Sequence, residues 1–269
     1  MSKRKKEEVI VVEGEKKPKR KLENKVQKIV NEKLNNGIKK HISKIDPEIN
    51  FRYNSFNICI GNQGSSKTTT VMKELMKLAY VEHDYHLMIY VTDNASDDTF
   101  NQLSDEIDFQ IVKTDYDHVE EEFERLMELK KDYNAMVDGE IEEDPEILEY
   151  LYVDDFSRQR LHTFILFDDA SFVFDAKSNS RFKKWLCQCR HLNITAFCCI
   201  QIWGSLDAKL KSQLSGAFIF KGFGRERLSY IYRQLPIEMD FEDFYKKYMS
   251  LKKYQKLIVD CVDNTICVL

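Results

Sequence analysis

The sequence contains no apolar run long enough to cross a bilayer. Its longest apolar stretches, such as 164–167 and 196–200, hold only four or five residues, whereas a membrane-spanning helix needs about 20. The N-terminal residues also lack the apolar segment of a secretory signal peptide, because lysine and arginine dominate there. These absences predict an intracellular protein without a membrane span.

The sequence also lacks a cysteine framework. It has seven cysteines, but no CxxC pair and no cysteine–histidine spacing typical of a zinc site. Four of them stand in apolar or helical surroundings, namely Cys187, Cys189, Cys198 and Cys199. We interpret these four as reduced core residues of a protein that works in a reducing compartment.

Charge is unevenly distributed along the 269 residues. Residues 1–44 carry 15 Lys/Arg against 6 Asp/Glu, a net charge of +9, whereas the remainder carries 26 against 39, a net charge of −13. We therefore predict a basic N-terminal arm over 1–48, with a helix at 25–44, followed by an α/β domain over 49–269. The arm is a solubilising tail, a DNA contact or, through Lys16–Lys21, a nuclear address.

One glycine-rich segment carries the chemistry. Residues 61–68 read GNQGSSKT, between an apolar run at 56–60 and a predicted helix at 69–80. Strand, glycine loop, Lys-Thr and helix make up the phosphate-binding P-loop arrangement, in which backbone N–H groups and the helix N-terminus face the phosphates. The candidate nucleotide-binding residues are Gly61, Asn62, Gln63, Gly64, Ser65, Ser66, Lys67, Thr68 and Thr69.

Within this loop we assign two roles. Lys67 reaches the β- and γ-phosphates of ATP, and the Thr68 hydroxyl holds Mg²⁺. One position departs from the usual pattern, because Ser66 stands where glycine is common and must enter the required backbone geometry with strain. Read alone, the segment also fits a Gly/Ser-rich surface turn before an amphipathic helix.

A second motif lies about 100 residues downstream. Residues 163–167 form an apolar run that ends in Asp168 and Asp169. A buried parallel strand whose tip carries acids is the Walker B pattern. Asp168 is the predicted Mg²⁺ ligand, and Asp169 stands where many ATPases polarise the attacking water. The alternative is a buried strand that ends in an ordinary Asp-Asp turn.

The remaining pattern predicts a three-layer α/β fold with a mostly parallel sheet of the additional-strand ATPase type. Further strands are expected at 87–91, 109–112, 194–200 and 217–220, with a closing hairpin at 256–262 and 265–269. Further helices are expected at 120–136, 182–189, 206–214 and 237–248, and the acidic stretch 138–149 is expected to be a solvated loop. Gln201 ends the strand at 194–200, where it senses the γ-phosphate or simply caps the strand.

Several segments together resemble a known family. GNQGSSKT, the strand FILFDDA, the segment 190–194 (RHLNI), Gln201 and the segment 218–227 (FIFKGFGRER) occur in order over residues 50–235. They resemble the poxvirus-type genome-packaging ATPases of large DNA viruses, virophages and related mobile elements, within the FtsK/HerA superfamily. The resemblance implies a homo-oligomeric ring that hydrolyses ATP with Mg²⁺ and moves double-stranded DNA into a capsid at a packaging vertex.

The resemblance also implies a location and an arginine supplied by a neighbouring subunit. The location would be the host cytoplasm, a viral factory or the virion, and the basic arm adds the nucleus. The candidate arginines are Arg190, Arg225 and Arg227. The candidate DNA-contacting basic residues are Lys183, Lys184, Lys209 and Lys211.

Two other functions fit parts of the sequence. A nucleotide kinase or helicase-like ATPase would share the P-loop, although the double acid at 168–169 and the terminal Gln201 argue against a kinase. A nucleotide-binding module without hydrolysis is the third hypothesis, because Ser66 replaces the usual glycine.

Overall fold

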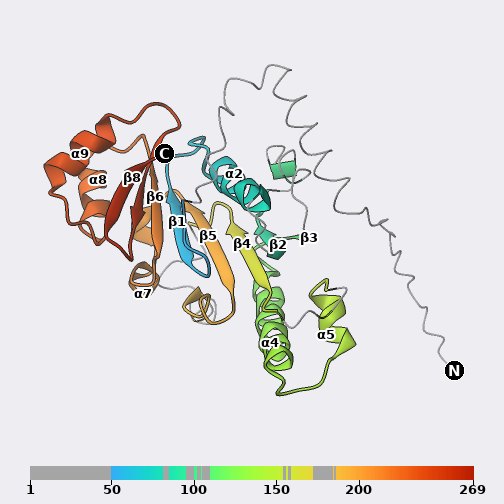
Figure 1. Ribbon diagram of the computed structural model, residues 1–269. Helices are drawn as coiled ribbons and strands as arrows, with labels where there is room; N and C mark the ends of the chain where they lie inside the picture. Colours follow the sequence, from blue (N-terminus) through green and yellow to red (C-terminus); the bar gives the residue numbers. More distant parts are fainter. Residues whose placement is uncertain are drawn as a thin grey trace. The chain divides into compact units, whose positions relative to one another are not determined.

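In a computed structural model of the protein, a single sheet carries every predicted motif (Figure 1). The structure describes residues 50–80, 85–94, 100–101, 104, 110–153, 156, 159–171, 184 and 186–269. The predicted arm at 1–48 lies outside these residues, as do residues 182, 183 and 185 of the predicted helix at 182–189.

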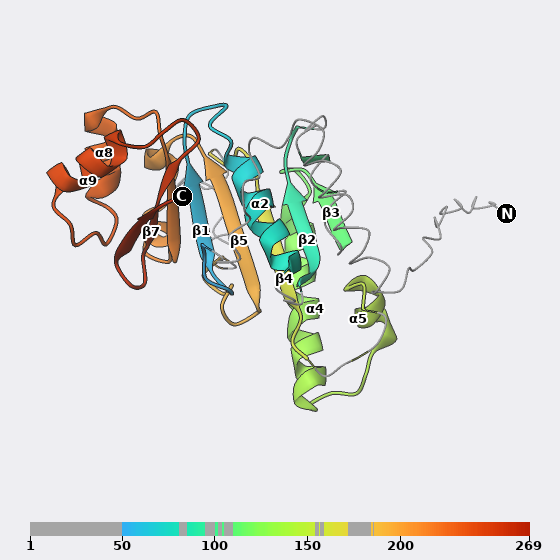
Figure 2. The same cartoon turned by 45° about the horizontal axis from the view of Figure 1, so that its top comes forward.

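Eight strands form this sheet in the order β3-β2-β4-β5-β1-β6-β7-β8 (Figure 2). They are β1 (Phe56–Ile60), β2 (Tyr85–Val91), β3 (Gln110–Thr114), β4 (His162–Phe167), β5 (Ile194–Ile200), β6 (Gly216–Phe220), β7 (Lys256–Asp260) and β8 (Thr265–Val268). Strands β1 to β6 are paired in parallel, and β7 and β8 are added antiparallel. The mostly parallel sheet and the closing hairpin are therefore confirmed.

Strand β5 lies between β1 and β4. Its Ile200 is paired with Ile60 of β1, and its Cys198 is paired with Phe167 of β4. Although β5 follows β4 in the sequence, it is inserted in the sheet between the two strands that carry the Walker motifs, as expected for the additional-strand ATPase type. The loops after β1, β4, β5 and β6 consequently meet at one edge, which we call the carboxyl edge, where ligands bind in open parallel sheets.

Helices cover both faces of the sheet, as expected for three layers. The helices are α2 (Lys67–Tyr80), α4 (Val119–Asp138), α5 (Pro145–Tyr150), the 3₁₀ turn η2 (Trp203–Ser205), α7 (Ala208–Lys211), α8 (Arg225–Tyr232) and α9 (Phe241–Met249). Helix α2 packs on one face with Cys59 and Phe197, whereas α4, α8 and α9 pack on the other with Ile58 and Ile60. The alternation follows from the two-residue period of a strand.

Three predicted elements differ from the structure. The acidic stretch 138–149 is not a loop throughout, because α5 begins at Pro145 with the Asp144 carboxylate accepting a hydrogen bond from the Glu146 N–H. Proline at the first helical position after an Asp cap is a helix start signal. The helix expected at 206–214 is shortened to α7, and the helix expected at 237–248 begins only after the Asp240 cap.

Among the described residues, no helix combines the length and apolar character needed to cross a membrane.

Candidate nucleotide site

The P-loop connects the carboxyl end of β1 to α2, as predicted. The Gly61 N–H donates to the carbonyl of Ile200 at 3.2 Å, which fixes the loop to the end of β5. A Cβ on Gly61 would lie 2.4 Å from Ser65 Oγ and 2.8 Å from Phe220 Cβ. Only glycine fits here, because the loop turns directly against the neighbouring strand β6.

Two loop residues adopt left-handed backbone conformations. Gly64 has a φ of 71° and Ser66 a φ of 68°. Glycine enters this region freely, whereas the Cβ of serine makes it costly by roughly 1 kcal/mol. The strain expected at Ser66 is therefore present in the backbone, and the loop keeps its P-loop course in spite of it.

Lys67 is folded back onto the loop. The side chain is 9% exposed, and its Nζ donates to the carbonyl oxygens of Gly61 and Asn62, each at 3.2 Å. The buried Ser65 Oγ has no hydrogen-bond partner in the described part of the chain. A buried hydroxyl without a partner is unfavourable, and a bound phosphate oxygen would provide that partner. The Ser65 hydroxyl and the Lys67 ammonium are therefore both available as donors to phosphate.

The Walker A threonine and the Walker B aspartate are in direct contact. Thr68 Oγ1 donates to Asp168 Oδ1 at 2.6 Å, and the Tyr90 hydroxyl donates to Asp168 Oδ2 at 3.3 Å. A hydroxyl and a carboxylate are the oxygen ligands that Mg²⁺ takes in P-loop sites. The donor set therefore fits the predicted magnesium, with Thr68 and Asp168 as the residues that would hold it.

A second tyrosine is hydrogen-bonded to the backbone of this aspartate. The Tyr116 hydroxyl donates to the backbone carbonyl of Asp168 at 2.6 Å. Burial raises the pKa of Tyr116 well above its ordinary value, so it stays a neutral donor. Sequence reasoning missed both tyrosines, although the phenol of Tyr90 within the apolar run 87–91 was a usable signal.

Asp169 and Gln201 meet at the tips of β4 and β5. Gln201 Nε2 donates to Asp169 Oδ1 at 2.9 Å, and the Gln201 N–H donates to Ser171 Oγ at 2.9 Å. Asp169 itself has a left-handed φ of 51° and an exposed side chain. The two predicted catalytic groups at the sheet edge are thus brought together and face solvent.

The candidate arginines lie in three different places. Arg227 is at the site: its Nη2 donates to the backbone carbonyl of Gln201, and its Nη1 lies 3.5 Å from Asn62 Oδ1. Arg225 turns instead toward α9, where it pairs with Glu242 and lies over the Tyr245 ring at 4.8 Å.

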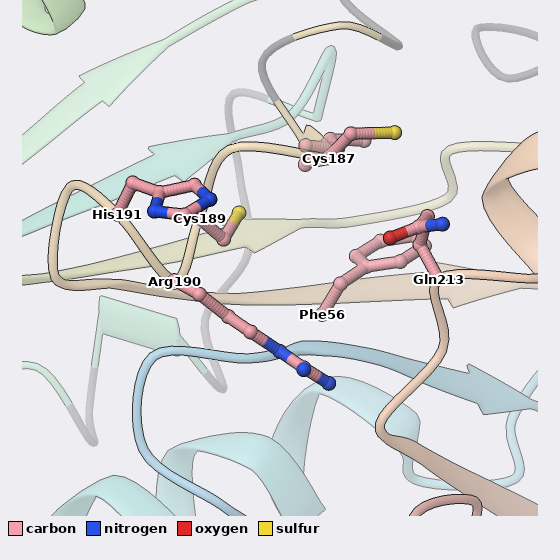
Figure 3. Close-up of a pocket in the computed structure, with 7 residues that line it drawn as sticks. Phe56, Cys187, Cys189, Arg190, His191 and Gln213 are labelled. Carbon is pink, nitrogen blue, oxygen red and sulfur yellow. The ribbon is translucent and has the colours of Figure 1, made fainter.

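Arg190 lies at the amino ends of the strands, opposite the P-loop. Its Nη2 is 3.5 Å from Ser215 Oγ, just before β6 begins. Arg190 lines a cavity of about 180 Å³ together with Phe56, Leu186, Cys187, Cys189, His191 and Gln213 (Figure 3). The site of this chain's own P-loop therefore does not include Arg190.

The predicted basic patch lies partly at the same amino edge. Lys209 and Lys211 belong to α7, just before β6, and Lys211 Nζ is 5.6 Å from the Trp203 ring centre. Lys184 and Lys209 are exposed. Lys183 lies outside the described residues.

Solved structures share this fold. The genome packaging NTPase B204 from Sulfolobus turreted icosahedral virus 2, in complex with ATPγS, matches with a TM-score of 0.53 at 16% identity, over 80% of this chain and 96% of that chain. The DNA-packaging ATPase B204 from Sulfolobus turreted icosahedral virus matches with the same TM-score, identity and coverage.

A further ATPase structure has a similar domain. ATPases 2 and 3 of EssC from Geobacillus thermodenitrificans match with a TM-score of 0.53 at 15% identity, over 80% of this chain and 39% of that chain. No protein-family model and no curated protein sequence matches this chain. At these identities the likeness shows the α/β fold of P-loop ATPases.

Proposed function

We propose that this protein is an ATP-hydrolysing motor that moves double-stranded DNA into a viral capsid. The observation that carries the proposal is the 2.6 Å contact between Thr68 of the P-loop and Asp168 of β4. Two motifs 100 residues apart meet at the carboxyl edge in the geometry that a Mg²⁺–ATP site needs. The fold shared with B204, a genome packaging NTPase, supports the role in packaging.

The residues divide the work of hydrolysis. Lys67 neutralises the β- and γ-phosphates after it leaves its loop carbonyls. Thr68 and Asp168 would hold Mg²⁺, which would supply positive charge beside the phosphates. Asp169 orients the attacking water, and Gln201 fixes the Asp169 carboxylate through the 2.9 Å hydrogen bond. This chemistry requires positioning and charge neutralisation but no covalent intermediate.

DNA and the capsid vertex are the proposed partners, in a homo-oligomeric ring. The exposed Lys184 and Lys209, together with the basic run at 1–44, supply the positive charge that DNA phosphates need. An otherwise acidic body would keep DNA away from the remaining surface. Because phosphate contacts release counterions, DNA binding should weaken steeply as salt rises from about 50 to 200 mM.

Steady-state phosphate release tests the hydrolytic half of the proposal. Wild-type protein should hydrolyse ATP only with Mg²⁺, while Lys67→Ala and Asp169→Asn lower kcat by about 100-fold or more. Lys73→Ala is the matched control, since Lys73 is an exposed lysine on the same helix α2. Turnover that required an acceptor nucleotide would instead indicate a kinase, and binding without turnover would indicate a nucleotide-binding module.

A further inference from the structure

We propose that Arg227 contacts the terminal phosphate of the ATP molecule bound by the P-loop of its own chain. The inference rests on the proposed nucleotide site. It gives this arginine a role within one subunit, distinct from that of an arginine supplied by a neighbour.

The position of the terminal phosphate follows from the residues around it. Lys67 would contact the β- and γ-phosphates, Asp168 would hold the metal, and Asp169 would orient the attacking water. The γ-phosphate therefore lies between the start of the loop and the tips of β4 and β5. Asn62 and Gln201 flank this position from the loop side and from the strand side.

Arg227 bridges these two flanking residues. Its guanidinium donates to the Gln201 carbonyl and approaches the Asn62 side chain at 3.5 Å. Asn62 in turn donates through Nδ2 to the Gly222 carbonyl at 3.0 Å, which joins the P-loop to the β6–α8 connection. The arginine thus stands at the mouth of the site, on the first turn of α8.

The present partners of Arg227 are weak competitors for a phosphate. Both acceptors are neutral oxygens, whereas phosphate oxygens carry negative charge and can accept two parallel bonds from the planar guanidinium. No carboxylate is paired with Arg227 within the described part of the chain. The Phe223 ring lies 4.5 Å from its guanidinium carbon and supports the planar group without neutralising it.

Arg225 provides an internal comparison two residues away. It begins the same helix, but Glu242 and two aromatic rings hold its guanidinium against α9. An exposed arginine on α8 is therefore not enough to reach the site, and Arg225→Ala is a matched control for Arg227→Ala.

The test compares nucleotides that differ by one phosphate. Dissociation constants for Mg²⁺–ADP and for a non-hydrolysable Mg²⁺–ATP analogue are measured on wild type, Arg227→Ala, Arg227→Lys and Arg225→Ala. Arg227→Ala should weaken the analogue about tenfold or more while ADP changes less than about twofold. Arg227→Lys should recover part of the loss, and Arg225→Ala should match wild type.

Equal losses for both nucleotides would show a purely structural role, and no loss for either would also overturn the proposal. This test measures only binding. A wild-type protein that binds ATP without hydrolysing it would contradict the motor proposal, but the affinities for ADP and the ATP analogue could still be compared among the variants.

Mixed oligomers separate action within a chain from action on a neighbour. Arg227→Ala and Lys67→Ala chains carrying different tags are co-expressed and purified through both tags, and analogue binding is measured. If Arg227 acts on its own chain, the P-loops that keep Lys67, which belong to the Arg227→Ala chains, should still bind the analogue weakly in the mixture. Recovery of wild-type affinity would mean that the Lys67→Ala chain supplies the arginine in trans, which contradicts the proposal. If no doubly tagged protein forms, the chains act singly, and a selective loss in Arg227→Ala then arises within one chain.

Discussion

The side-chain amide of Gln201 donates a hydrogen bond to the Asp169 carboxylate at 2.9 Å, across the tips of two neighbouring strands. Within the part of the chain that the structure describes, no other group is hydrogen-bonded to the Asp169 side chain, so its second oxygen can accept a hydrogen bond from water. Gln201→Ala should therefore lower kcat by roughly 100-fold while KM for ATP changes less than about threefold, because the lost contact positions the base rather than the nucleotide.

Gln201→Glu sharpens this prediction. It keeps the length of the side chain but places a second negative charge against Asp169, so kcat should fall at least as far as in Gln201→Ala. A raised KM with unchanged kcat in Gln201→Ala would show that Gln201 binds nucleotide and does not organise Asp169.

Ser66→Gly should relieve backbone strain in the P-loop. The serine has a φ of 68°, a conformation that glycine adopts without the Cβ penalty. We expect a gain in unfolding free energy of up to about 1 kcal/mol and unchanged or tighter ATP binding. Chemical denaturation and nucleotide titration measure both. A clear loss of stability would show that the Ser66 side chain makes a needed contact.

Gly61→Ala should disable the loop by steric conflict. The new methyl group would lie 2.8 Å from Phe220 Cβ, an atom fixed in the buried strand β6. We expect ATP affinity to fall more than about tenfold with the sheet still folded, as judged by circular dichroism and nucleotide titration. Gly204→Ala is the control, because its Cβ would meet nothing closer than 3.9 Å. Normal ATP affinity in Gly61→Ala would contradict the close packing of loop and strand.

Lys130 should make stability rise with pH. Burial lowers the pKa of this lysine from 10.5 to about 7, and the side chain is 2% exposed. Between these values the unfolded chain holds more protons than the folded one. The free energy of unfolding therefore rises from about pH 7 toward pH 10, approaching about 1 kcal/mol per pH unit.

The control for this prediction is Lys130→Met, which removes the titrating group at similar length. It also removes the hydrogen bonds to the Leu161 carbonyl at 2.9 Å and to Thr163 Oγ1 at 2.8 Å. The quantity to compare is therefore the pH slope rather than the absolute stability. Equal slopes of the unfolding free energy against pH for the two proteins between pH 7 and 9 would contradict a lowered pKa of Lys130 in the folded state.

Local motifs predicted much of the site, because their residues lie in sequence-adjacent loops at the ends of recognisable strands. The apolar runs before Gly61, Asp168 and Gln201 placed all three at one edge. The start of α5 was overlooked although Asp144-Pro145 is a local helix signal.

Contacts between distant elements could not be predicted in the same way. The side chains of Tyr116 and Arg227 reach the site only through the order of the strands and the course of the β6–α8 loop. The place of Arg190, by contrast, follows from the predicted strand at 194–200, because a residue just before a parallel strand lies at the edge opposite the carboxyl edge.

The motor claim is tested most directly by the effect of double-stranded DNA on the ATP hydrolysis rate of the full chain. The account predicts that DNA raises the steady-state rate several-fold at low salt, that the rise fades as salt screens the phosphates, and that Lys67→Ala abolishes it. An ATPase rate that is the same with and without DNA at every salt concentration would contradict the account and leave an ATPase whose work is not the movement of DNA.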